Sequence, residues 1–261
     1  MIRSLYSGIS GLKSHQYKMD VIANNISNVN TIGYKSSRVN FEDLIYQKTN
    51  QSGVYPSYVG LGVNVSGVDT LFTQGGLKAT GRPLDVAIQG NGFFVLKDTV
   101  TDRTYYAREG VFYLDKDGYL INGHGYRVQD TNGADIQINN PEEVVTLTIL
   151  NDGQIKLVRS DGTTEFAGPI GLMSFKNPET LERVGQNVFL ATIDTQTSFS
   201  TPVTPGQQGQ GILVSGYLEM SNVDLASEFT DMIVTQRGYQ ANARVITTSD
   251  QMLQELLDIK R

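Results

Sequence analysis

The segment that decides the fold is LYSGISGLKSHQYKMDVIANNI, residues 5–26, together with its counterpart LASEFTDMIVTQRGYQANARVITTSDQML, residues 225–253. In both, apolar residues recur at alternating steps of about three and four, the a/d spacing of a coiled coil. A glutamine interrupts each series, at Gln16 and Gln236, and an alanine follows at Ala23 and Ala243. We therefore expect a long helix at each end of the chain, with the two helices paired.

The stripe on these helices has two possible roles. On a single helix, an a/d stripe is more often ordinary core than a contact between subunits. Two stripes that match in register favour the second role, because helices that only packed on another domain would need broader apolar faces. We predict an assembly seam made of Leu5, Ile9, Leu12, Met19, Ala23, Ile26, Leu225, Phe229, Met232, Tyr239, Ala243, Ile246 and Leu253.

Composition limits the classes of partner. The chain has 261 residues, with 21 Lys+Arg against 27 Asp+Glu and a formal net charge of -6. This balance argues against binding to nucleic acid or to an anionic membrane. There is no cysteine, which excludes disulfides and thiolate chemistry. The N-terminus lacks the pattern of a secretory signal, and no uncharged stretch reaches membrane-spanning length, so we expect a cytoplasmic protein or one exported without signal cleavage.

The middle of the chain has the pattern of a β domain. From Val63 onward the apolar period shortens toward two, and Asp-Gly or Asn-Gly pairs such as Asp117-Gly118 and Asn132-Gly133 separate runs rich in Val, Ile, Tyr and Phe. We predict strands at 86–88, 93–96, 105–108, 111–114, 126–129, 146–149, 155–158, 170–175 and 188–192. The expected fold class is α+β: a helical coiled-coil module of residues 1–30 and 222–261, a connector of 31–66, and a central all-β domain of 67–221.

We expect the connector to be the least ordered part of the chain. Phe41, Leu44 and Ile45 could form one helical turn, and the polar stretch 48–57 carries Gly53 and Pro56. We predict a flexible connector marked by Lys48, Gly53 and Pro56.

No pattern of catalytic, cofactor-binding or metal-ligating residues stands out. His15 falls on the polar face of the first helix and His124 between two glycines, so each is interpreted as a surface histidine. The stretch 115–118 resembles part of a calcium loop but lacks its further ligands, and 90–92 lacks the helix that a phosphate loop needs. Both are interpreted as turns. We expect no enzyme, no cofactor and no metal.

Three stretches of the sequence resemble the signatures of bacterial flagellar rod and hook proteins. They are residues 4–12 with 19–35, residues 84–94, and residues 216–224 with 232–233 and 236–242. The resemblance implies a helical, tubular homopolymer in the extracellular flagellum, with the terminal helices lining the inner tube and the β domain outside. It implies export by the flagellar type III apparatus without a cleaved signal peptide. The implied partners are copies of the chain, neighbouring rod, cap and hook-filament junction proteins, and the export apparatus.

Within this family, two members fit. Residues 41–47 look more like the distal rod protein, whereas 235–242 and 245–256 look more like the short hook proteins. We predict a hook subunit, because the polar stretch 48–57 offers little packing against bending; the alternative is a distal rod subunit of the basal body. Two other classes remain open: a peptidoglycan hydrolase would need an acid pair or nucleophile that the sequence lacks, and a ligand-binding module would not polymerise.

Overall fold

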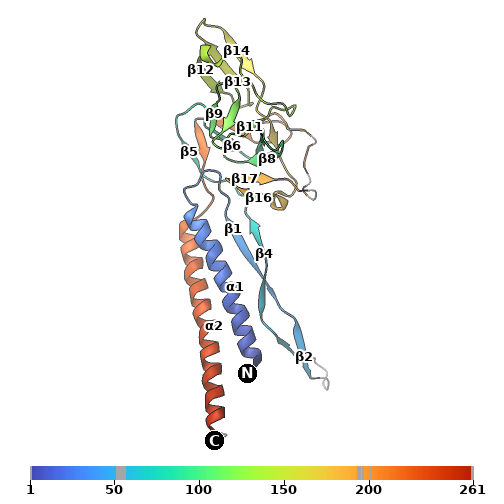
Figure 1. Ribbon diagram of the computed structural model, residues 1–261, viewed down its shortest axis with the longest axis vertical. Coiled ribbons are helices and arrows are strands. Elements are labelled where there is room, and N and C mark those ends of the chain that lie inside the picture. The colour runs from blue at the N-terminus through green and yellow to red at the C-terminus, as the bar shows by residue number, and fades with distance from the viewer. Residues whose placement is uncertain (1, 51–56, 193–194, 196, 200, 260–261) are drawn as a thin grey trace. The chain divides into compact units, whose positions relative to one another are not determined.

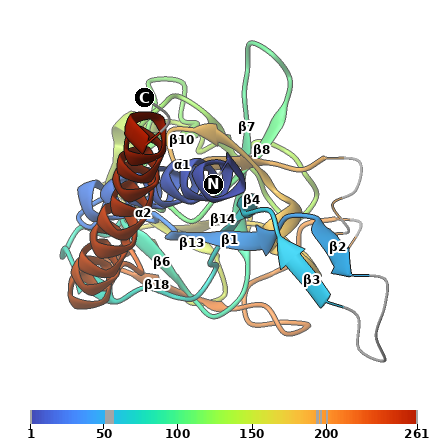
Figure 2. The same ribbon diagram turned by 90° about the horizontal axis from the view of Figure 1, so that it is seen from below.

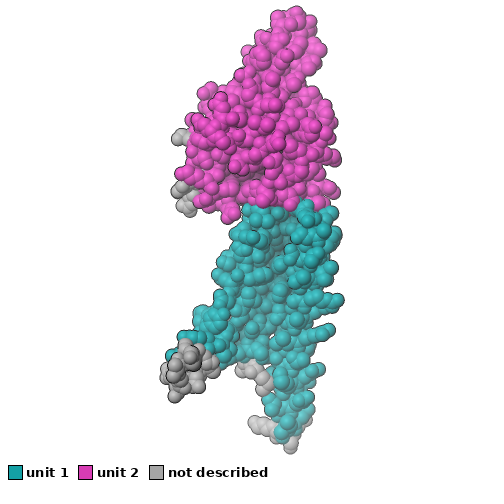
Figure 3. Space-filling view, turned by 180° about the vertical axis from the view of Figure 1, so that it is seen from behind, with its two compact units in different colours: residues 1–28, 36–71, 223–261 teal, residues 29–35, 72–222 magenta. Residues whose placement is uncertain are grey.

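The computed structural model describes residues 2–50, 57–192, 195, 197–199 and 201–259. The chain divides into two compact units, coloured teal and magenta in Figure 3. The first, called here the helical unit, comprises Met1–Asn28, Ser36–Leu71 and Val223–Arg261. The second, called the β unit, comprises Val29–Lys35 and Phe72–Asn222. The fold class is α+β, as the sequence predicts.

Two antiparallel helices dominate the helical unit. α1 spans Ile2–Ser27 and α2 spans Leu225–Ile259, and they lie side by side in both views (Figures 1 and 2). Asp224 caps α2, because its Oδ1 accepts a hydrogen bond from the Ala226 N–H at 3.0 Å. Both expected helices are therefore present.

A two-stranded ribbon completes the helical unit and lies on the side of α1 away from α2 (Figures 1 and 2). β1 (Ser37–Asp43) pairs antiparallel with β4 (Val63–Thr70), and β2 (Tyr46–Asn50) pairs antiparallel with β3 (Ser57–Gly60). The predicted helical turn is wrong, because Phe41 lies in β1 and Leu44 donates its N–H to the Gly62 carbonyl. Val39 and Phe41 alternate with polar residues in this stretch, a period of two that indicates a strand.

The predicted connector is thus paired along most of its described length. Lys48 lies in β2 opposite Tyr58 of β3. Gly53 and Pro56 lie outside the described residues. The hydrogen bonds between these paired strands order the described part of the connector, although its composition is polar.

The β unit contains fifteen strands among its described residues. They are β5 (Leu77–Ala79), β6 (Val86–Gln89), β7 (Phe93–Lys97), β8 (Thr104–Ala107), β9 (Phe112–Leu114), β10 (Leu120–Asn122), β11 (Arg127–Val128), β12 (Val144–Ile149), β13 (Ile155–Arg159), β14 (Thr164–Ala167), β15 (Leu172–Met173), β16 (Glu182–Gly185), β17 (Val188–Leu190), β18 (Ile212–Ser215) and β19 (Tyr217–Glu219), with short 3-10 helices at Pro141–Glu143 and Pro178–Thr180. Each of the nine predicted strand positions holds a strand.

An eight-stranded sheet organises this unit. Its order is β16-β17-β8-β7-β11-β10-β9, with β15 also paired to β7. Smaller sheets are β12-β13-β14, β18-β6 and β19-β5. Along β7, Phe94 and Leu96 join one buried cluster and Phe93 and Val95 join another. Successive side chains of a strand point to opposite faces, so this apolar run shows that β7 is buried on both faces.

The turn predictions are also confirmed. Gly118 has φ 80°, and its N–H donates to the Asp115 carbonyl at 3.0 Å. The stretch that imitates a calcium loop is therefore a tight hairpin turn, as expected. Gly90 and Gly92, both with positive φ, form the turn that leads into β7.

Candidate functional site

The face of α1 that contacts α2 is built mostly from polar and small residues. Ser4 Oγ lies 3.4 Å from Ser249 Oγ. Lys18 Nζ lies 3.3 Å from Asp231 Oδ1, and Asn25 donates from Nδ2 to Glu228 Oε1 at 2.9 Å. These contacts run along almost the whole length of α1, so the helix pair is fixed at both ends.

Glycines bring the two helices close together between those polar contacts. A Cβ atom placed on Gly11 would lie 2.7 Å from Asn242 Nδ2, and one on Gly238 would lie 2.7 Å from His15 Cε1. Both distances are shorter than van der Waals contact. Small residues at these positions therefore permit an approach that larger side chains would prevent.

The contacting face is displaced from the predicted seam by one residue. On α1 the facing positions are 4, 8, 11, 15, 18 and 25, each preceding a position of the a/d series by one. On α2 the positions 228, 231, 238 and 242 are offset in the same direction. One residue turns an α-helix by about 100°, so most of the apolar stripe lies beside the pair rather than inside it.

The structure leaves much of that stripe accessible. Leu225, Phe229 and Tyr239 are 39%, 50% and 37% exposed, and Ile9 is 41% exposed. Ala23 is also exposed, and the remaining members are half-buried: Leu5, Leu12, Met19, Ile26, Met232, Ala243, Ile246 and Leu253. Of these, Ile246 lies at the helix pair, where it packs against Gly8. The role of the stripe as a seam between subunits stays a prediction.

The ribbon is hydrogen-bonded to α1 at the two ends of the β1–β4 pair. At one end, the Ser14 hydroxyl donates to the Val63 carbonyl at 3.5 Å, and the Val63 N–H donates to Ser10 Oγ at 3.3 Å. At the other end, Asn25 donates to the Ser37 carbonyl at 2.8 Å and accepts from the Ser37 N–H at 3.0 Å. Asn25 is 1% exposed and joins α1, α2 and β1, so it fixes the arrangement of the helical unit.

The interpretation of His15 as a surface histidine is wrong. Its ring is half-buried, packed against Gly238 of α2 and 6.0 Å from the Phe41 ring of β1, measured between centroids. Its Nδ1 is buried and has no hydrogen-bond partner among the described residues. Burial, with a smaller contribution from the Lys18 ammonium, lowers the pKa of His15 below its ordinary value.

This environment predicts that the helical unit loses stability as the pH falls below about 6.5, the unfolded pKa of histidine. The folded pKa is lowered, so the unfolded chain binds the proton more readily, and stability is lost as the pH falls through the folded value. Hydrogen exchange of α1 amides at pH 7.5 and pH 5 measures this loss. Glu228, whose pKa is raised by burial, also belongs to the helical unit. The same measurement is therefore made on His15→Gln, which keeps Glu228 and removes the imidazole. Equal pH dependence in both proteins would contradict the prediction.

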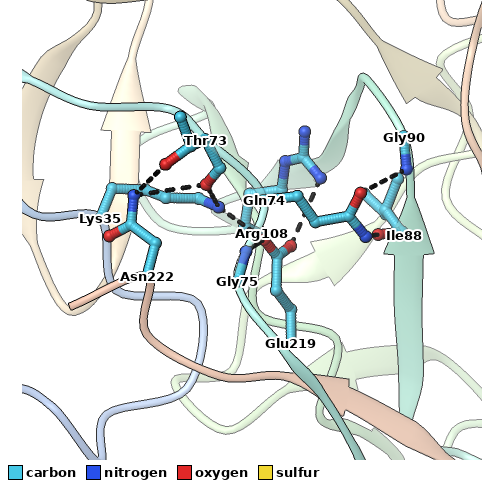
Figure 4. A network of polar contacts seen from close by, with 9 residues as sticks. All are labelled: Lys35, Thr73, Gln74, Gly75, Ile88, Gly90, Arg108, Glu219 and Asn222. Atoms are coloured by element: carbon cyan, nitrogen blue, oxygen red, sulfur yellow. Dashed lines mark hydrogen bonds and ion pairs between the residues drawn. The ribbon is translucent and has the colours of Figure 1, made fainter. Parts of the chain in front are cut away.

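In the β unit, a buried carboxylate holds two cations (Figure 4). Glu219 Oε1 accepts from Lys35 Nζ at 2.5 Å and from the Gly75 N–H at 3.0 Å, and its Oε2 lies 3.3 Å from Arg108 Nη1. The Lys35 ammonium also donates to the Thr73 carbonyl at 2.8 Å. The side chains of Lys35 and Glu219 are fully buried. One carboxylate therefore forms ion pairs with two buried cations.

This network ties together segments that are distant in sequence. Lys35 ends the stretch 29–35, Gly75 lies in a loop, and Glu219 ends β19. Gly33 also donates its N–H to the Glu219 carbonyl at 2.8 Å. Burial lowers the pKa of Lys35, and the adjacent Glu219 carboxylate opposes this effect. The network joins segments that lie next to three of the four points at which the chain passes between the two units.

Sequence reasoning missed Lys35, Arg108 and Glu219. A signal existed, because Lys35 closes the N-terminal signature and Glu219 lies within the C-terminal one. Charged residues in both signatures could have been paired as candidates. The geometry shows that the two signatures meet at this ion pair.

The described residues show no group of three His, Asp or Glu side chains that could hold a metal ion. Neither described helix is long and apolar enough to cross a membrane.

Comparison with family models matches three parts of the chain. Residues 5–35 match the flagella basal body rod protein model, 87–157 match the flagellar hook protein FlgE/F/G D1 domain, and 214–259 match the flagellar basal body rod FlgEFG protein C-terminal model. The first and last of these regions contain Lys35 and Glu219. The matched regions contain most of the helix pair and the strands β7 to β11 of the main sheet.

Similar proteins align over the full chain. The flagellar basal-body rod protein FlgG of Bacillus subtilis (strain 168) is 45% identical over 269 residues, which cover 100% of both chains. FlgG of Borreliella burgdorferi is 38% identical over 275 residues, again covering 100% of both chains. The flagellar hook protein FlgE of the same organism is 29% identical over 448 residues. Members of this family are structural proteins rather than enzymes, and the chain belongs to the family of bacterial flagellar rod and hook proteins.

Proposed function

We propose that the chain is a subunit of the distal rod, the drive shaft of the flagellar basal body, which polymerises into a helical tube. The observation that carries this proposal is full-length similarity to basal-body rod proteins, at 45% identity over 269 residues. The hook relative aligns at 29% over 448 residues, which requires long insertions relative to this chain of 261 residues. The preference for a hook subunit in the sequence analysis is therefore replaced by its alternative.

The packing of the ribbon supports a stiff rather than a bending subunit. The hook prediction used the polar stretch 48–57, of which residues 51–56 lie outside the described part of the chain. In the neighbouring described residues, β1 pairs with β4, and Ser10, Ser14 and Asn25 bond the ribbon to α1. Sliding of this segment along α1 would break several hydrogen bonds at once, and each buried donor or acceptor left unpaired costs about 1–3 kcal/mol.

The exposed stripe supports polymerisation. Phe229 and its neighbours on the stripe lose contact with water only if other copies cover them, and burial stabilises by about 25 cal/mol per Å² of apolar surface. A head-to-tail contact that does not close into a ring gives a helical filament. Other flagellar proteins would then contact the two ends of the tube, and export without signal cleavage belongs to the same proposal.

Electron microscopy of polymers from the purified protein tests the assignment. A rod subunit is expected to give straight, stiff tubes, and curved or readily bent tubes would contradict it. A genetic test runs in parallel: the gene should restore motility to a Bacillus subtilis strain that lacks its basal-body rod protein FlgG. Restoration of a strain that lacks its hook protein instead would favour the hook.

A further inference from the structure

The C-terminal end of α2 projects beyond the start of α1. Ser4 lies opposite Ser249, and α1 begins at Ile2, whereas α2 continues to Ile259 (Figure 1). In an antiparallel pair Ile2 then lies opposite about residue 251, so residues 252–259 extend past the start of α1 by about 12 Å at 1.5 Å per residue. Within the described helical unit, this end has no helix beside it.

This projecting end is amphipathic and acidic. Met252, Leu256 and Ile259 are spaced by four and three residues, so they share one face, and they are 47%, 51% and 81% exposed. Glu255 and Asp258 add negative charge and have no ion-pair partner among the described residues. Residues 250–259 contain no Lys or Arg, and the basic residues 260 and 261 lie outside the described part.

A groove in the same unit has the complementary character. It lies between α1 and the ribbon, with a volume of about 420 Å³, and Tyr6, Ile9, Leu44 and Leu61 give it an apolar lining. Arg3 and Lys13 supply positive charge. In the described part of the chain, neither of these two cations has an ion-pair partner.

The groove cannot be filled by the α2 of its own chain. α2 contacts α1 at positions 4, 8 and 11, whereas the groove uses 6, 9 and 13, which lie on the opposite side of the helix. α2 is one continuous helix whose residues 242–249 are held against the other side of α1. Only another molecule can bring such a segment there.

We propose that residues 250–259 of one subunit bind in the Arg3/Lys13 groove of a second copy of the chain, with Leu256 facing the apolar lining and Glu255 near Lys13. This inference rests on the proposed function, because it names the contact through which subunits of the tube hold one another. Apolar burial supplies affinity, and the opposite charges set the register.

Disulfide trapping tests the contact, because the chain has no native cysteine. Single variants Ile9→Cys and Leu256→Cys are mixed, polymerised and oxidised, and a cross-linked heterodimer is expected. The matched control replaces L256C with D258C, which lies about 160° away around the helix, and should cross-link at least about fivefold less. Equal cross-linking of both mixtures would overturn the proposed face. A disulfide formed within the I9C/L256C double variant as a monomer would overturn the second copy as occupant.

Charge reversal gives an independent readout. Lys13→Glu should raise the critical concentration for polymerisation about fivefold, and the double variant K13E/E255K should restore it. A double variant no better than K13E would overturn the pairing. Polymers of normal form without any I9C to L256C cross-link would overturn this contact alone, whereas failure of the wild-type protein to polymerise would overturn the proposed function with it.

Discussion

Replacing Glu219 with glutamine is expected to destabilise the β unit by about 3–5 kcal/mol, because it leaves Lys35 and Arg108 facing a neutral amide in the interior. The side chain keeps its size, so the loss reports charge rather than packing. Hydrogen exchange of amides in β5 and β19 during urea titration measures the effect within this unit. A loss below about 1 kcal/mol would contradict the role of the network.

Two further variants separate charge balance from simple loss of contact. Lys35→Met should cost roughly less than half as much as E219Q, because Glu219 keeps Arg108 and the Gly75 N–H. Glu182→Gln makes the same charge change on an exposed residue of β16 and should stay within about 0.5 kcal/mol of the wild type. Equal losses of stability in K35M and E219Q would show that the loss in E219Q does not come from leaving two buried cations without a carboxylate.

The sequence predicted both helices and nine of the fifteen strands described in the β unit because their signals are local. A period near 3.6 spans α1 and α2, and apolar runs such as Phe93–Leu96 are bounded by turn residues. The strands β1–β4 were missed because one face is polar and exposed. Their polar composition resembles that of a loop, and the alternation of Val39 and Phe41 with polar residues is too short to decide between the two without the pairing of β1 with β4.

The contact between the helices was predicted on a face one residue away from the observed one. A hydrophobic pattern cannot detect an interface built from Gly11, Gly238 and Asn25, because these residues contribute close approach and hydrogen bonds rather than apolar area. The Glu219 network was not predicted, for another reason. Its partners Lys35 and Arg108 are 184 and 111 residues away along the chain, so no local window contains them.

Because the apolar stripe lies beside the helix pair rather than inside it, a charge placed on the stripe is expected to have a large effect on polymerisation. Phe229 is 50% exposed in the monomer, so Phe229→Asp should leave the helix pair folded, with unchanged hydrogen exchange in α1. In the polymer the same side chain would be desolvated, and burying an unpaired carboxylate costs several kcal/mol. We expect the critical concentration for polymerisation to rise about a hundredfold or more, since each 1.4 kcal/mol is a factor of ten.

The matched control is Phe229→Leu, which keeps an apolar side chain at the same position of α2. It should polymerise within about tenfold of the wild-type concentration, because only part of the aromatic area is lost. Sedimentation of polymer against soluble protein measures all three chains under one set of conditions. If F229D assembles like the wild type, the stripe beside the helix pair is not the seam, and its exposed residues must be covered in another way. If F229L fails as completely as F229D, the position requires the aromatic ring itself, and a contact of specific shape replaces the general apolar seam.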